Sequence, residues 1–314
     1  MMKRDIILTA KNDQRVEFYD GSTHELLAAL EMPAPVHELA LTPDAATAYG
    51  SVFGGGVFGK NKDPDHRLVV IDIASRQIDG YIDTGACVAP HGMIFGADGV
   101  LWVTAELNHA LLGIDVRSRR VIHTIDIGGA AHWVLAHPDG RRLYASCKQT
   151  PNVAVIDLAT RSVSGQITIP NCCEGMAMAA DGEYLYVASH SAPEVNVIDT
   201  RSDRLVKSLR FEGAGADFPQ LRRARLSPDR RWLLVSSSKD RTVAVFRLPS
   251  LEQTALIAVG NAPMGFAFSV VPDRALVCNH DDGMVTELDL VNGVAGSNFV
   301  TGKGCEYAEY YAVA

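Results

Sequence analysis

The chain has 314 residues, of which 47% are hydrophobic, and this length and composition are sufficient for a large buried core. The formal net charge of −8 argues against the basic surface that nucleic-acid binding requires, so we expect no nucleic-acid partner. The sequence contains no apolar run of about 18 residues, which predicts neither a transmembrane helix nor a membrane partner.

The first 14 residues begin with charged side chains and contain no continuous apolar segment, because Thr9 and Lys11 interrupt it. This start predicts no secretory signal and a cytoplasmic protein, or a periplasmic one if a signal has been removed. Three short strands follow, at Ile6–Ala10, Arg15–Asp20 and His24–Leu30. These three segments do not include an innermost strand of their own.

The most regular stretch runs from Arg141 to Val187 and contains four short alternating segments separated by turns. Strands this short and evenly spaced are typical of an all-β array. The unit recurs about every 42 residues, which is the period of β-propeller blades with four strands each. A Val-Ile-Asp sequence or a close variant marks the repeats at Ile71-Asp72, Ile114-Asp115, Ile156-Asp157, Ile198-Asp199 and Leu288-Asp289.

The combination of Leu-Tyr-Val, Val-x-Val-Ile-Asp, Gly-x-x-Pro and Ser-Pro-Asp segments resembles the YVTN-repeat (YncE-like) propeller family, over nearly the whole chain. Together, the repeat and the resemblance imply an all-β fold, a seven-bladed β-propeller in one domain, residues 1–314. The segment from Cys305 onward has the alternation of an inner strand. We therefore expect it to complete the first blade, so that N- and C-terminal strands close the ring.

Two insertions interrupt the repeats. Residues from Ser51 to Arg67 include three consecutive glycines, a proline and mixed charges, which predict a mobile loop that covers the channel as a lid. A smaller insertion extends from Phe211 to Gln220.

Alignment of the inner strands places one residue of each repeat at the start of the strand, where it faces the channel. This column contains His37, His91, His132, Glu174, Arg222, Met264 and Glu306. The three histidines, with Glu174 and Glu306, predict a metal site, because imidazole suits copper, iron and zinc, and a carboxylate completes such sets. Copper or iron is favoured and zinc or magnesium is the alternative. Histidines at blade junctions can equally be structural.

A second column lies at the end of the next strand outward and should open on the same face. It contains Lys11, Glu106, Lys148, His190, Ser238 and His280. His190 and His280 are the candidate catalytic acids or bases of this column, since histidine titrates near neutral pH. Arg222 would bind a substrate carboxylate through a bidentate pair. The alternative is a solvated rim without a catalytic role.

Three functions agree with these columns. The first is a metal-dependent enzyme, foremost an oxidoreductase with His-ligated copper or iron, that acts on a small molecule in the funnel. The second is a lyase or lactonase that uses a histidine base, without a metal or with magnesium or zinc. The third is a binding scaffold without catalysis. Fold alone does not decide among them.

Overall fold

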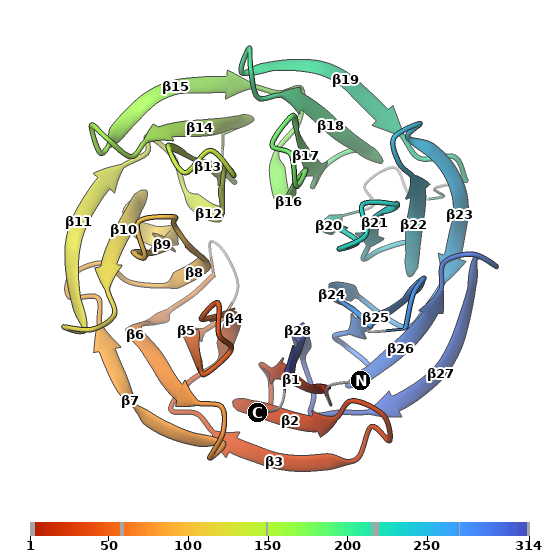
Figure 1. Ribbon diagram of the computed structural model, residues 1–314, viewed down its shortest axis with the longest axis horizontal. Coiled ribbons are helices and arrows are strands. Elements are labelled where there is room, and N and C mark those ends of the chain that lie inside the picture. The colour runs from red at the N-terminus through yellow and green to blue at the C-terminus, as the bar shows by residue number, and fades with distance from the viewer. Residues whose placement is uncertain are drawn as a thin grey trace.

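The computed structural model describes residues 4–56, 60–148, 150–213, 215, 220–269 and 271–312. These residues form seven four-stranded antiparallel sheets arranged as blades around a central axis, as Figure 1 shows. The predicted all-β, seven-bladed propeller is therefore confirmed. Within the described ranges the helical structure is a single 3₁₀ turn at Glu106–Asn108, and no helix there is long and apolar enough to cross a bilayer.

Each blade contains an inner strand, two middle strands and an outer strand. The inner strands are β4 (Val36–Leu41), β8 (Pro90–Phe95), β12 (Ala131–Ala136), β16 (Cys173–Met178), β20 (Leu221–Leu226), β24 (Pro263–Phe268) and β28 (Cys305–Ala312). The second strands are β1 (Arg4–Ala10), β5 (Thr47–Gly55), β9 (Leu101–Ala105), β13 (Arg142–Cys147), β17 (Tyr184–Ser189), β21 (Trp232–Ser237) and β25 (Arg274–Asn279). The third strands are β2 (Arg15–Asp20), β6 (Asp63–Asp72), β10 (Ala110–Asp115), β14 (Asn152–Asp157), β18 (Glu194–Asp199), β22 (Thr242–Arg247) and β26 (Met284–Asp289). The outer strands are β3 (Leu26–Glu31), β7 (Gln77–Asp83), β11 (Arg120–Asp126), β15 (Ser162–Thr168), β19 (Arg204–Arg210), β23 (Glu252–Ala258) and β27 (Val294–Val300).

The first blade is assembled from both ends of the chain. β28 pairs antiparallel with β1, with Ile6 opposite Tyr310 and Leu8 opposite Ala308, so the blade has the order β28-β1-β2-β3. This pairing confirms the predicted closure by N- and C-terminal strands. Because β28 takes the innermost place in this blade, the inner edge of β1 is paired and does not face the channel.

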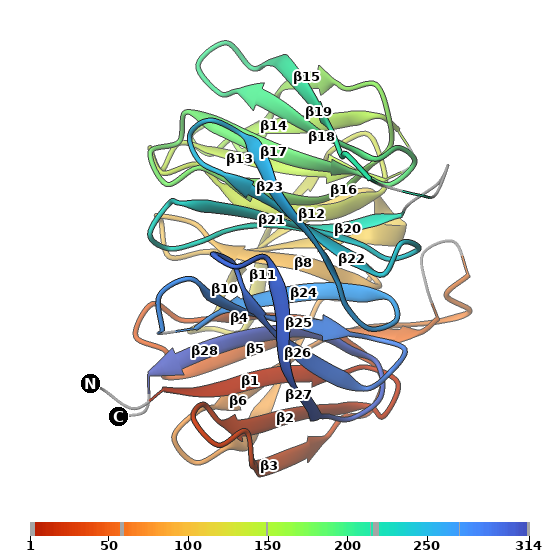
Figure 2. The same ribbon diagram turned by 90° about the vertical axis from the view of Figure 1, so that its right-hand side faces the viewer.

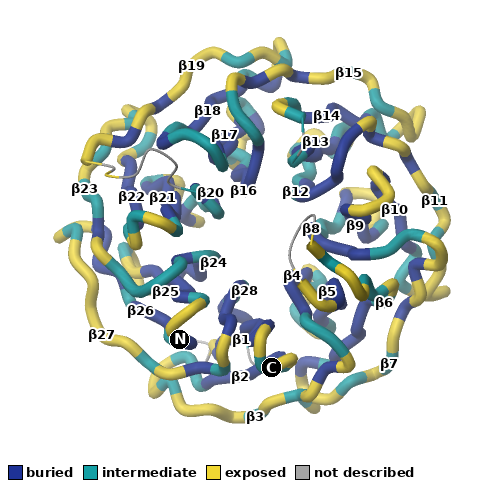
Figure 3. The backbone as a smooth tube through the Cα atoms, turned by 180° about the vertical axis from the view of Figure 1, so that it is seen from behind, coloured by how far each residue is buried: buried dark blue, intermediate teal, exposed yellow. Residues whose placement is uncertain are grey.

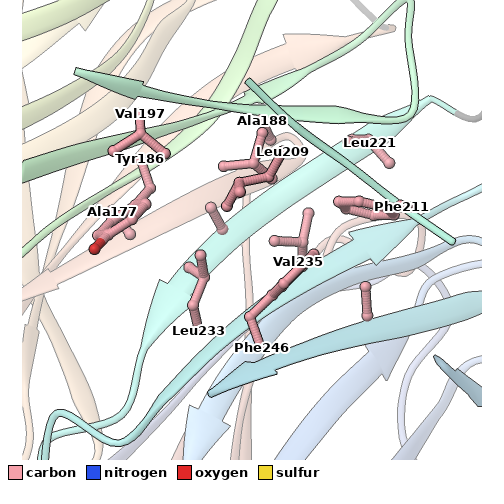
Figure 4. Close-up of a cluster of buried hydrophobic side chains, with 13 residues drawn as sticks. Ala177, Tyr186, Ala188, Val197, Leu209, Phe211, Leu221, Leu233, Val235 and Phe246 are labelled. Atoms are coloured by element: carbon pink, nitrogen blue, oxygen red, sulfur yellow. The ribbon is translucent and has the colours of Figure 1, made fainter. Parts of the chain in front are cut away.

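The hydrophobic core is divided among the spaces between neighbouring blades. Between the fifth and sixth blades, Tyr186, Val197 and Leu209 pack against Leu233 and Phe246, as Figure 4 shows. The second strands are almost fully buried, whereas the outer strands alternate and lie at the exposed circumference in Figure 3. Blade stacking therefore supplies the apolar burial, and the channel is left free to contain polar side chains.

Every inner strand contains a β-bulge near its start. The register between β4 and β5 shifts between Val36 and Leu39, and the other six inner strands shift at the corresponding place. A bulge places an extra residue on one strand and breaks strict alternation. Two consecutive positions of each inner strand can therefore face the channel instead of one, although the second position is a glycine in three strands, at Gly92, Gly175 and Gly265.

The first insertion differs from the prediction of a loop. β5 continues to Gly55 and β6 begins at Asp63, so most of Ser51–Arg67 extends the β5–β6 hairpin; residues 57–59 lie outside the described part. Burial of Val52 and Phe53 and pairing of Gly54 with Pro64 favour strand over loop. Figure 2 shows this hairpin projecting from the face opposite the chain termini.

Removal of residues from Gly304 onward should prevent stable folding. The deletion would remove β28, expose the edge of β1 and take Ala308, Tyr310 and Tyr311 out of two interblade cores. Soluble yield and the melting temperature by circular dichroism measure this effect. A soluble truncated protein with an unchanged melting temperature would contradict the role of β28.

Candidate functional site

One cavity of about 660 Å³ occupies the channel on the face opposite the chain termini. Both columns predicted from the sequence line it, with all seven ring positions and all six positions of the second column. Phe53 and Lys60 of the β5–β6 hairpin also line this cavity, which we call the funnel. The arrangement brings together residues that are almost three hundred positions apart in the chain.

The bulges and a set of hydroxyl groups position the ring residues. The Thr104 hydroxyl on β9 accepts a hydrogen bond from the Gly92 N–H (2.8 Å) and donates one to the His132 carbonyl in the next blade (2.8 Å). Thr9 makes the corresponding bond to the His37 carbonyl, and Ser146 makes the one to Glu174. Each hydroxyl therefore forms hydrogen bonds with backbone groups at the start of the inner strands and links one blade to the next.

The three ring histidines lie side by side on neighbouring blades. The ring centroids of His91 and His132 are 4.2 Å apart, those of His37 and His91 are 5.2 Å apart, and Phe53 packs on His37 at 4.1 Å. All three imidazoles are buried. Burial lowers the pKa of His37 to about 3 and holds the pKa values of His91 and His132 well below the usual range. The histidines are therefore neutral at physiological pH.

Glu174 is the centre of a buried ionic network. Its carboxylate lies 3.1 Å from the Arg222 guanidinium, 3.4 Å from Lys148 Nζ, and 3.9 Å from Nδ1 of His190. Burial alone would raise the pKa of Glu174, but Lys148 and Arg222 outweigh it and lower the pKa. On the other side of the ring, Lys11 lies 3.5 Å from Glu306. Both glutamates of the ring are thus ionised and paired with cations.

Two buried ionisable residues that directly follow ring positions in the sequence, Glu38 and Arg223, were missed by the sequence analysis. Burial raises the pKa of Glu38 to about 8, against the opposing effect of Arg223. Arg223 donates to Glu38 across the channel, and its guanidinium lies 4.4 Å from the centre of the Trp133 ring. Although burial opposes it, Glu38 and then Glu306 raise the pKa of Arg223, so this side chain stays cationic. The available signal was a charged residue directly after a ring position, where strict alternation would turn the side chain away from the channel and toward the neighbouring blade.

Glu106 differs from the other funnel carboxyls. Both of its side-chain oxygens are buried without a hydrogen-bond partner among the described residues. Burial raises the pKa of Glu106 to about 8, against the opposing effect of Lys148. At neutral pH this carboxyl is largely protonated and can donate a proton into the funnel. It belongs to the second column, although the sequence did not single it out as catalytic.

The donor set for the predicted metal is only partly in place. Both nitrogens of His37 and Nδ1 of His91 and His132 are buried without hydrogen-bond partners in the described structure, which suits a ligand. Glu174 and Glu306, however, are already paired with Lys148 and Lys11. No three His, Cys, Asp or Glu side chains of the described ranges are arranged to hold a metal ion together. The metal site stays a prediction.

The remaining candidate residues do not all line the funnel. His190 and His280 both line the funnel, and Nδ1 of His280 is 2.8 Å from Asp281. Cys173 and Cys305, which directly precede the two ring glutamates, do not line it, and their thiols donate to backbone carbonyls in the neighbouring blades. Met264 does line the cavity.

A family model described as YNCE-like beta-propeller matches residues 52–224, more than half of the chain. The chain belongs to the YNCE-like β-propeller family. A search of curated proteins finds no match.

Solved structures similar to this YNCE-like propeller share its fold at low sequence identity. The periplasmic gluconolactonase of Pseudomonas aeruginosa superposes with a TM-score of 0.81 at 20% identity, and the match covers 99% of each chain. A putative 6-phosphogluconolactonase of Bacteroides fragilis gives 0.81 at 13% identity, covering 99% of this chain and 98% of that one. Hydrazine synthase of Kuenenia stuttgartiensis gives 0.74 at 17% identity, covering 87% and 91%. At these identities the likeness extends to the fold alone.

The raised pKa of Glu106 predicts a specific pH dependence of stability. The carboxyl binds its proton up to about pH 8 in the folded state, but only to about pH 4.5 when unfolded. Between these values the folded state binds more protons, so the contribution of Glu106 to stability falls as pH rises. Glu106→Gln keeps a neutral group and should be more stable than wild type at pH 8, with a smaller difference at pH 5.

Urea unfolding of both proteins at pH 5 and pH 8 measures this difference. Glu31→Gln, at an exposed position on β3, is the matched control and should show no such pH dependence. Equal unfolding midpoints of Glu106→Gln and wild type at both pH values would contradict the buried protonated carboxyl.

Proposed function

We propose that this protein is an enzyme that hydrolyses the lactone of an anionic small molecule in the funnel, with a neutral histidine as general base. The observation that carries the proposal is the convergence of buried neutral imidazoles, a protonated carboxyl and several cations on one enclosed volume of about 660 Å³. A concave site in which a few polar groups with perturbed pKa values converge is the usual place of catalysis.

The charge of the funnel supports an anionic substrate. Among the described residues, seven lysine and arginine side chains line the cavity, against four carboxylic acids, one of which is the largely protonated Glu106. Glu174 and Glu306 offset only part of this positive charge. A carboxylate or phosphate on the substrate would be attracted into the funnel and bound by the guanidinium group of Arg222.

The chemistry follows from the groups in reach of the cavity. Lactone hydrolysis requires a water molecule that attacks the carbonyl carbon, a base that accepts its proton, and an acid that protonates the ring oxygen as the C–O bond breaks. His190 is the proposed base, since its pKa is lowered by burial and Glu174 lies beside its Nδ1. Glu106 is the proposed acid, and Lys148 would stabilise the oxyanion. His280, beside Asp281, is the alternative base.

The residues of the funnel favour lactone hydrolysis, and the descriptions of two similar structures agree with this reaction. Two of the similar structures, aligned over nearly their whole length, are described as a gluconolactonase and a putative 6-phosphogluconolactonase. At their low identity to this chain, the superposition supports only the shared fold, and the residues of the funnel support the reaction. A protonated acid, a neutral base and cationic groups are what ester hydrolysis needs.

His190→Ala should lower kcat for lactone hydrolysis by about 100-fold or more, because general-base catalysis typically contributes that factor. Arg222→Ala should mainly raise KM for an anionic lactone, whereas Arg222→Lys should retain part of the binding. The assay follows acid release from glucono-1,5-lactone and its 6-phosphate with a pH indicator, above the spontaneous rate. His24→Ala, at the turn between β2 and β3, is the control and should leave kcat unchanged. A wild-type protein that accelerates neither lactone would overturn the proposal.

The second candidate is a metal-dependent oxidoreductase, and the unpartnered nitrogens of the three buried ring histidines favour it. His37, His91 and His132 would hold copper or iron, with zinc or magnesium as alternatives, and Glu174 or Glu306 would complete the set. A bound metal would supply Lewis-acid or redox chemistry at the floor of the funnel.

Metal analysis of protein purified without an affinity tag distinguishes the two candidates. If this second candidate is correct, the wild type contains stoichiometric metal, His91→Ala contains none, and His190→Ala retains it. Wild-type protein that binds no transition metal at micromolar concentration would remove this candidate and leave the metal-independent lactonase.

A further inference from the structure

A second cavity, of about 630 Å³, occupies the opposite end of the channel. Arg4 and Ala312 line it, so it opens on the face that Figure 2 shows beside the chain termini. Glu38 and Trp133 line this second cavity, whereas Arg223, which contacts both of them, lines the funnel. The Arg223–Glu38–Trp133 cluster therefore lies between the two cavities.

The two cavities have opposite chemical character because each inner strand changes character along its length. The ring positions, at the start of each inner strand, are mostly histidine, glutamate and arginine, and they line the funnel. Farther along the same strands, apolar residues line the second cavity, among them Met93, Phe95, Met176, Met178 and Trp133. All but Met176 of these side chains are partly exposed, so apolar surface faces the cavity.

Three of the four charged side chains that line the second cavity, Glu38, Arg225 and Glu309, have partners within the protein, and the fourth, Arg4, is exposed. Arg225 is paired with Glu309, and it also donates to the Phe266 carbonyl at 2.7 Å. Glu38 accepts from Arg223. Apart from the exposed Arg4, a charged ligand would have to compete with an existing partner at each of these side chains, whereas an uncharged ligand would not.

We propose that the second cavity is a binding site for an uncharged, apolar small molecule. Its volume lies within the roughly 300–1,000 Å³ typical of small-molecule sites. Three methionines give the wall adaptable thioether contacts, and Trp133, Phe95 and Tyr307 supply aromatic faces. The site is separate from the funnel and does not depend on the reaction proposed for it.

The methionines of the chain provide built-in reporters. Met93, Met176 and Met178 line the second cavity, Met264 lines the funnel, and Met32 lies in an interblade core. Protein labelled with ¹³C in the methionine methyl groups is titrated at pH 7 with 2-naphthol, an uncharged aromatic probe. Single Met→Leu substitutions assign the resonances. We expect saturable shifts of the three cavity methyl groups with one dissociation constant, while Met264 and Met32 stay unchanged.

Two charge-introducing variants test the location in an independent way. Met178→Glu places a charge in the second cavity and should weaken 2-naphthol binding at least tenfold. Val206→Glu places the same charge at an exposed position of β19 and should leave the affinity unchanged. The melting temperature of each variant shows whether it is folded.

If Met178→Glu does not fold, the methyl titration of the wild-type protein decides alone. An absence of saturable shifts at Met93, Met176 and Met178 would overturn the proposal. Saturable shifts that appear at Met264 instead would place the probe in the funnel and would overturn it equally.

Discussion

The pairing of β28 with β1 is the constraint on which the rest of this structure depends. Each blade packs its apolar faces against two neighbours, and the first blade has an inner strand only because the C-terminal segment supplies it. With the ring closed, the interblade spaces contain the apolar burial and the seven inner strands surround one axis (Figure 1). Only then can residues from positions 11 and 306 share one ion pair. Pairing between the two distant ends of the chain is therefore required before the channel residues can be brought together.

The bulge at the start of each inner strand determines what the channel contains. In a regular strand, every second side chain would turn toward the neighbouring blade. The bulge instead directs both His37 and Glu38 to the channel, and likewise both Arg222 and Arg223. Three of the additional residues, Glu38, Trp133 and Arg223, form the cluster that separates a polar funnel from an apolar cavity. One local irregularity, repeated seven times, thus produces two chemically different ends of a single channel.

Burial and charge act against each other in the funnel, and the balance differs from residue to residue. Burial keeps the ring histidines neutral, and it keeps Glu106 largely protonated. Glu174 is equally buried, yet it stays ionised because Lys148 and Arg222 lie within 3.4 Å. Carboxyls with such different protonation states in one cavity are the arrangement that acid–base chemistry requires. The same cations give the funnel the sign of charge that attracts an anion.

The sequence by itself determined the number of blades, the closure by the C-terminal strand and the two columns that line the funnel. A repeat of about 42 residues carries this information because equivalent residues occupy equivalent places in every blade. It did not determine the β5–β6 hairpin, where the glycines suggested a loop but Phe53 is buried against His37. Nor did it reveal the contact between Glu38 and Arg223, which are 185 positions apart. Only the tertiary structure decided that contact and the protonation of Glu106, because both depend on which groups from other blades, and how much solvent, surround a side chain.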